Sequence, residues 1–175
     1  MFSLQEAALG HAISAEKLIE GGADFLNNNE PAIPVFINLL LQSIEITFKA
    51  FATQTELATD RELRSREITR NGHGLNEIAS LIDGRINDNT IIDLLLPRQG
   101  FAVSNSILNA MIYGQKFHPT RESYCSRNII YAQFDLGELQ VIGGVLEWAL
   151  AIKQAAQNID RAVAIYNQQV CIQNS

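Results

Sequence analysis

The stretch VFINLLLQSIEITFKAFA, residues 35–52, decides the fold of this chain. It is apolar over most of its length, and its long polar side chains are Asn38, Gln42, Glu45 and Lys49. Their spacings of 4, 3 and 4 residues place all four on one side of an α-helix. An apolar helix with one narrow polar stripe is typical of a helix buried in a bundle, so the stretch predicts an all-α fold.

Signals for further helices occur on both sides of this stretch. Ser3 and Glu6 form a capping-box pattern, which predicts a first helix from the start of the chain. The helix that contains the stripe is expected from about Pro34 to Thr53, because proline is tolerated in a first helical turn. Residues 54–70 alternate in charge, which fits either a solvated helix or a connector. Later helices are expected over residues 75–82, 91–96, 103–116 and 136–170.

Local details support the later part of this assignment. Asp88 precedes an apolar segment as a helix cap would. Gly143 and Gly144 interrupt the last expected helix, which suggests a kink or a close helix crossing. No alternating strand pattern occurs in the sequence. We therefore predict a single-domain antiparallel bundle of five to six helices over residues 1–175.

The composition of the chain restricts its function classes. Of 175 residues, 47% are hydrophobic and 18% are charged, as in ordinary globular domains. The formal net charge of −6 argues against general binding to nucleic acid or anionic membranes. It is compatible with a local basic site. Glu45 and Lys49 interrupt the longest apolar run, which favours a bundle helix over a membrane span. We expect a cytoplasmic protein that does not bind membranes.

Metal and cofactor motifs are missing from the sequence. Cys125 and Cys171 are far apart and lack Cys-x-x-Cys spacing, so neither a disulfide framework nor a zinc site is predicted. The chain also lacks the GxxxxGK, HExxH and GxSxG patterns of large hydrolase and NTPase families. No metal and no cofactor are therefore expected.

The polar stripe has two interpretations, and both stay open. It can be a solvent-facing edge, with Glu45 and Lys49 as a favourable i, i+4 ion pair. Alternatively, the stripe faces a groove or a second subunit. In that case Asn38, Gln42 and Lys49 would contact a polar ligand, and Glu45 would orient a base or an arginine.

The segment Gly72-His73-Gly74-Leu75 is a second candidate site. The two glycines permit a sharp turn before Leu75 enters the core. His73 is then either a polar contact at the start of the next helix or a general acid or base, because imidazole titrates near neutrality.

These features together resemble the HEPN superfamily of small helical-bundle proteins. The resemblance rests on a Leu-rich helix that ends in SIEITFKA, residues 43–50, and on the Gly72-His73-x-Leu75 turn after a spacer. Residues 108–117 resemble a later helix and turn of some members, so the similarity covers roughly residues 35–118. An Asp often follows the His in that superfamily, and Gly74 stands there in this chain. The resemblance implies a HEPN-like bundle and a homodimer.

Many HEPN proteins are metal-independent ribonucleases of bacterial toxin or defence systems. They use an Arg and a His separated by roughly four to six residues, often supplied by two facing subunits. The resemblance assigns these roles to Arg66 and His73, with Glu45 orienting one of them. His73 would move a proton at the ribose 2′-hydroxyl or the leaving oxygen, and Arg66 would stabilise charge on the phosphate. The later region, where the superfamily usually carries its motif, has no such pair, and this favours a non-catalytic role.

The polar segment over residues 117–128 is a third candidate. His118, Arg121 and Arg127 lie there with Tyr124 and Cys125. Two guanidinium groups and a titratable ring can bind an anionic ligand or a nucleotide phosphate. The alternative is an ordinary surface loop with solvated charges.

Two functional hypotheses follow, and they leave open whether the chain is an enzyme. In the first, a HEPN-like protein acts on or through RNA, a nucleotide or a partner protein in a toxin–antitoxin or defence setting, with ribonuclease activity as its catalytic form. In the second, the chain is a non-enzymatic dimeric module or regulator. Its partner would then be a protein of the nucleotidyltransferase or antitoxin type.

Overall fold

The computed structural model describes residues 2–20, 23–29, 32–65, 77–78, 81–82, 84–86, 88–95 and 145–173. These residues are mostly helical, and no β-strand occurs among them, which confirms the predicted all-α class. The expected helix over residues 103–116 and the Gly143-Gly144 interruption lie outside the described residues. None of the helices in the described part of the chain combines the length and apolarity needed to cross a membrane.

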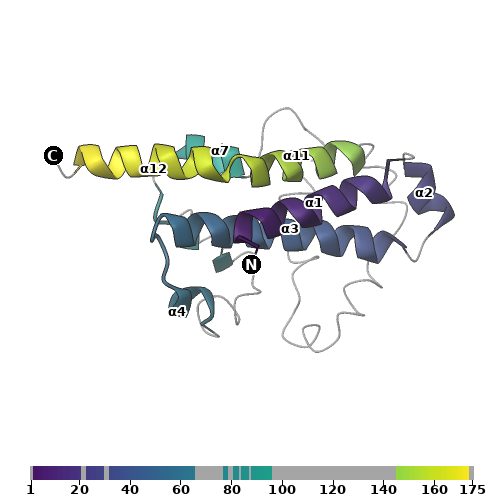
Figure 1. The fold of residues 1–175 in the computed structure, drawn as a ribbon, viewed down its shortest axis with the longest axis horizontal. Helices are drawn as coiled ribbons and strands as arrows, with labels where there is room; N and C mark the ends of the chain where they lie inside the picture. Colours follow the sequence, from purple (N-terminus) through teal and green to yellow (C-terminus); the bar gives the residue numbers. More distant parts are fainter. Residues whose placement is uncertain are drawn as a thin grey trace.

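The first helix, α1 (Leu4–Leu18), begins at the predicted capping box. The Ser3 amide donates to Glu6 Oε2 at 2.7 Å, and the Glu6 amide donates to Ser3 Oγ at 3.1 Å. Two backbone donors that the helix leaves unpaired are satisfied in this way. The short α2 (Ala23–Asn28) follows α1 and lies at one end of the bundle in Figure 1.

The stretch that carries the polar stripe forms the longest described helix, α3 (Ala32–Gln54). Its bounds agree with the predicted span to within two residues at each end. Beyond its end, Glu56 has a φ of 54°, in the left-handed region that turns a chain away from a helix. Figure 1 shows α3 running antiparallel to α1 across the middle of the bundle.

Small side chains bring α1 and α3 close together. The fully buried residues of α1 are all alanines, namely Ala8, Ala12 and Ala15, while Leu18 near its end packs against the core and is partly buried. The larger Leu4 and Ile13 are instead exposed. The packing of α1 therefore depends on close backbone approach more than on large apolar side chains.

The last expected helix is divided in two, which corrects the prediction of one continuous helix over residues 136–170. In the described part it consists of α11 (Val145–Gln157) and α12 (Ile159–Gln173). Asn158 separates them, and its amide contacts two carbonyl oxygens, Gln154 O at 3.0 Å and Ala155 O at 3.1 Å. The interruption is local, because α11 and α12 continue end to end in Figure 1.

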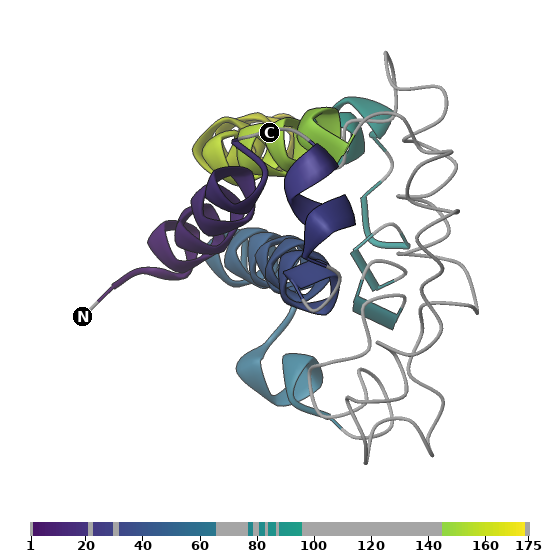
Figure 2. The same ribbon diagram turned by 90° about the vertical axis from the view of Figure 1, so that its right-hand side faces the viewer.

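Viewed along the bundle, α1, α3 and the α11–α12 pair form a triangle (Figure 2). The helix α7 (Asn89–Leu95) packs against α11 and α12. It begins after Asp88, whose Oδ1 accepts from the Thr90 amide at 2.7 Å, as the predicted cap requires. The charged connector contains one short helix, α4 (Asp60–Leu63), and residues 66–70 lie outside the described part.

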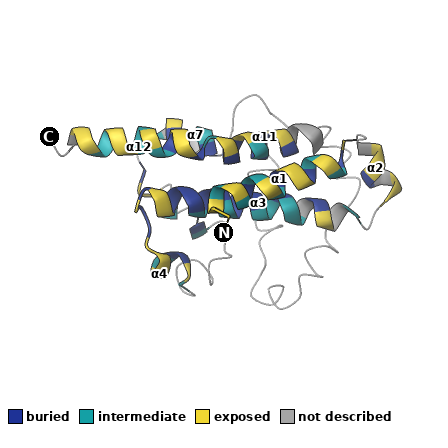
Figure 3. Ribbon diagram, viewed as in Figure 1, coloured by how far each residue is buried: buried dark blue, intermediate teal, exposed yellow. Residues whose placement is uncertain are grey.

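The core lies between these helices, and Figure 3 shows the buried residues gathered on their facing sides. Phe36, Leu40 and Phe51 of α3 are completely buried in this core. Phe51 meets Tyr166 of α12 edge to face, with ring centroids 6.0 Å apart. Further along the chain, Ile78 and Ile82 are helical and buried, in agreement with the helix expected over residues 75–82.

Candidate functional site

The polar stripe of α3 contains a partly buried ion pair. Glu45 and Lys49 lie one helical turn apart, and Lys49 Nζ is 2.6 Å from Glu45 Oε1. Glu45 is 8% exposed, and the Lys49 side chain is 21% exposed. A carboxylate withdrawn from water in this way is stabilised by a close cation, since an unpaired buried charge would be costly. The predicted i, i+4 pair is therefore confirmed.

The other two members of the stripe are less enclosed. Asn38 and Gln42 lie closer to the start of α3 and are both half-buried. The stripe thus runs from half-buried amides to a buried carboxylate. The solvent-facing interpretation is wrong for Glu45, while a role of the stripe in a groove or at a second subunit stays a prediction.

Two buried residues of α3 that carry a hydroxyl group, Ser43 and Thr47, were not singled out from the sequence. Ser43 Oγ donates to the Ala8 carbonyl oxygen at 2.8 Å in the buried contact between α3 and α1. Thr47 is 1% exposed, and its Oγ1 has no hydrogen-bond partner among the described residues. A serine inside an apolar helix was the one available signal for the first of these contacts.

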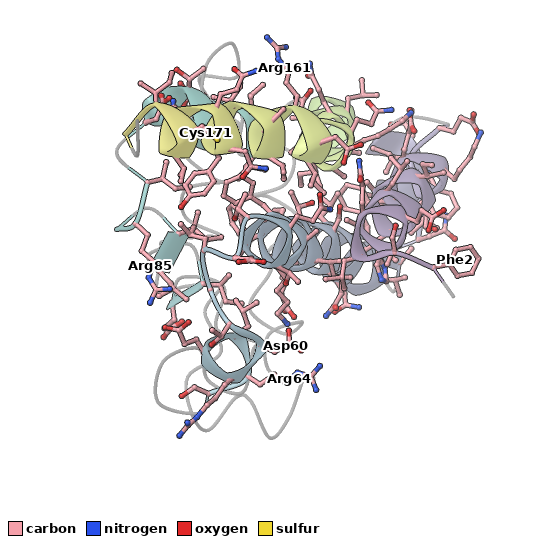
Figure 4. The ribbon with its side chains drawn as sticks, turned by 60° about the vertical axis from the view of Figure 1, so that its left-hand side comes forward. Phe2, Asp60, Arg64, Arg85, Arg161 and Cys171 are labelled. Carbon is pink, nitrogen blue, oxygen red and sulfur yellow. The ribbon has the colours of Figure 1, made fainter. Side chains whose placement is uncertain are left out.

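A second charged cluster joins the connector after α3 to the segment before α7. Arg85 Nη2 lies 2.7 Å from Glu62 Oε1, and Arg85 Nη1 also donates to the Leu57 carbonyl oxygen. Figure 4 shows Arg85 beside α4. Glu62 closes a capping box with Thr59, whose amide donates to Glu62 Oε2 at 2.8 Å. One carboxylate therefore serves as helix cap and as ion-pair partner at the same time.

The electrostatics of this cluster favour the ionised form of Glu62. The hydrogen bond from Arg85, followed by those from the Thr59 backbone and side chain, lowers the pKa of Glu62 from 4.5 to about 2. The Thr59-x-x-Glu62 spacing gave a sequence signal for the cap. Nothing local signalled Arg85, because it lies 23 residues from Glu62.

Polar contacts also join the C-terminal helices to the rest of the bundle. Lys153 Nζ of α11 lies 2.7 Å from Glu16 Oε2 of α1. Gln169 of α12 donates to Asp88 Oδ2 at the start of α7, and this hydrogen bond and that from the Thr90 amide hold the pKa of Asp88 below its ordinary value. These contacts hold helices together and do not converge on one site.

Most of the predicted catalytic and anion-binding residues lie outside the described residues, namely Arg66, His73, His118, Arg121 and Arg127. Of the predicted site residues that the structure does describe, it brings Glu45 and Lys49 into direct contact.

The described residues offer no cluster suited to a metal ion. No three His, Cys, Asp or Glu side chains within that part of the chain are grouped closely enough to hold one. Comparison of the chain with protein-family models, with curated proteins and with solved structures finds no match in any of the three.

Proposed function

We propose that this chain is a HEPN-like homodimeric interaction module, which acts in the cytoplasm by binding a partner protein and does not itself catalyse a reaction. The observation that carries the proposal is the state of Glu45. Glu45 is 8% exposed and forms an ion pair with Lys49 inside its own helix at 2.6 Å, and such a close cation is what stabilises a carboxylate that is largely withdrawn from water. In the proposed module that pair stabilises α3.

The surroundings of Glu45 support a structural role for α3. Ser43 and Phe51, two residues before it and six after it, are both buried and contact α1 and α12 respectively. A helix with such contacts acts as a scaffold of the bundle. The acidic net charge and the missing late Arg–His pair also favour binding over RNA cleavage.

The experiment compares wild type with His73→Ala in two assays. The module predicts that neither protein cleaves RNA in the presence of a chelator, and that His73→Ala lowers the melting temperature because the turn loses a structural contact. His11→Ala, on α1, is the matched control for the loss of an imidazole. If His73→Ala kept the melting temperature and the oligomeric state of the wild type, this result would contradict a structural role for His73.

The partner class follows from the resemblance, which implies a protein of the nucleotidyltransferase or antitoxin type. If a gene for such a protein lies beside the gene for this chain, its purified product is the probe for calorimetric titration. Saturable binding with a dissociation constant of about 1 μM or tighter would support the module. Absence of binding to such a neighbour would count against this partner class.

A ribonuclease is the second candidate function, and one observation favours it. Charged residues are rare on a helix as apolar as α3, yet Glu45 lies on this helix and is only 8% exposed. In this alternative Arg66 and His73 act on the scissile phosphate and ribose, and Glu45 orients one of them. The test is metal-free cleavage of a labelled RNA that is lost in Arg66→Ala and in His73→Ala but retained in His11→Ala. That result would support the ribonuclease and overturn the proposal of a non-catalytic interaction module.

A further inference from the structure

From Ala162 onward, α12 carries no charged side chain. Residues 162–175 contain no Asp, Glu, Lys, Arg or His, in a chain of which 18% of residues are charged. The exposed residues in the described part of this segment form what we call the distal face of α12: Ala164, Asn167, Gln168, Cys171 and Ile172. Ile172 is 75% exposed. Solvated helix faces normally carry charged side chains, so this composition is unusual for a surface that meets only water.

The position of α12 leaves this face accessible. The opposite side of the helix faces the bundle, where Tyr166 meets Phe51 and Gln169 donates to Asp88. At the left end of Figure 1, α12 projects beyond the other labelled helices. Cys171 of α12, labelled in Figure 4, is exposed.

The chemistry of the distal face matches that of a second identical face. A side-chain amide both donates and accepts hydrogen bonds, so Asn167 and Gln168 can pair with the same residues of another copy. Aliphatic side chains such as Ile172 likewise pack against their equivalents. A charged face, in contrast, would need opposite charge on its partner. Because each copy carries a net charge of −6, two copies repel each other least where they meet on an uncharged surface.

We propose that a second copy of this chain docks on the distal face of α12, so that two α12 helices pack together across a two-fold axis. The inference rests on the homodimer of the proposed function and assigns its interface. Twelve residues of described helix, 162–173, span about 18 Å. An interface based on one such helix pair is at the small end of the known range, so the dimer is weak and depends on protein concentration.

The test is sedimentation velocity of the full chain over a wide concentration range. Wild type is compared with Ile172→Glu, which places like charges in the contact, and with Phe2→Glu as the matched control. Phe2 is also an exposed apolar residue, 87% exposed, and lies on the other side of the described bundle from Cys171 in Figure 4. Circular dichroism checks that each variant keeps its helix content.

We expect wild type and Phe2→Glu to dimerise with similar dissociation constants, and Ile172→Glu to dimerise at least about tenfold more weakly. A dimer that persists unchanged in Ile172→Glu would overturn the assigned interface and leave the homodimer standing. A wild type that stays monomeric throughout would overturn both. Binding of a partner protein, measured separately by calorimetry, would still test the module function, and a partner that binds wild type but not Ile172→Glu would show that the face serves another chain.

Discussion

At the scale of single residues, Gly10 is a position where the native residue is not the most stable choice. It lies on the exposed face of α1, and a Cβ atom added there would meet no other atom within 4 Å. Glycine within a helix costs stability because it gains more conformational freedom on unfolding. We predict that Gly10→Ala raises the free energy of unfolding by about 0.5–1 kcal/mol, measured by urea denaturation.

A matched control separates this effect from a general benefit of alanine. His11→Ala also introduces alanine into α1, at the next position, and removes no glycine. Alanine is a better helix former than histidine too, but by a smaller margin than it is over glycine, so His11→Ala should raise stability less than Gly10→Ala does. A stability loss in Gly10→Ala would mean that the outer face of α1 is in close contact with another chain.

Individual contacts differ in how well they can be predicted from the sequence. Glu45 and Lys49 could be paired from their spacing, because residues four apart meet on a helix whatever surrounds them. Their burial could not be foreseen, since it depends on what packs against α3. The pair of Glu62 and Arg85 joins residues 23 positions apart, and such a contact follows from the path of the chain and not from a local pattern.

At the scale of helices, burial determines what a hydroxyl contributes. Ser43 Oγ and Ser14 Oγ each donate to a carbonyl oxygen at 2.8 Å, but the first bond is buried between two helices and the second is exposed within one. We predict that Ser43→Ala lowers the free energy of unfolding by about 1 kcal/mol, while Ser14→Ala changes it by less than about 0.5 kcal/mol. Thermal or urea unfolding of the two variants checks this, and equal effects would contradict it.

Helix bounds were predictable where polar caps or prolines mark them. The Ser3 and Asp88 caps and the extent of α3 all agree with their sequence signals. The buried alanine face of α1 was not predicted, because the burial of an alanine depends on how closely a second helix packs against it. Nor was the interruption at Asn158, where neither proline nor glycine is present to signal a break.

At the scale of the whole molecule, Glu62 makes stability depend on pH. Its pKa is about 2 in the folded chain and 4.5 ordinarily, so its stabilising contribution is complete above pH 4.5 and is lost as the pH falls towards 2. We predict that Glu62→Gln lowers the melting temperature at pH 7 and that the difference from wild type shrinks between pH 4.5 and 2. Melting curves across this range provide the measurement.

The control for net charge is Asp60→Asn, on the same helix. Its ion pair with Arg64, at 3.6 Å, is solvent-exposed on both sides, as Figure 4 shows for the two side chains. Such pairs contribute little to stability. If Asp60→Asn and Glu62→Gln gave the same melting curves at every pH, the ion pair of Glu62 with Arg85 would contribute no more to stability than the exposed pair of Asp60 with Arg64.

The two described ends of the chain occupy different surroundings, and this decides how the protein should be tethered. Helix α1 begins near the middle of the bundle, whereas α12 ends at the tip of the long axis (Figure 1). A fusion or surface anchor placed after residue 173 would crowd the neighbourhood of Ile172. One attached ahead of Phe2 leaves that tip open. An immobilised chain should thus recruit a copy from solution when it is held by its first residues, and recruit it poorly when held by its last.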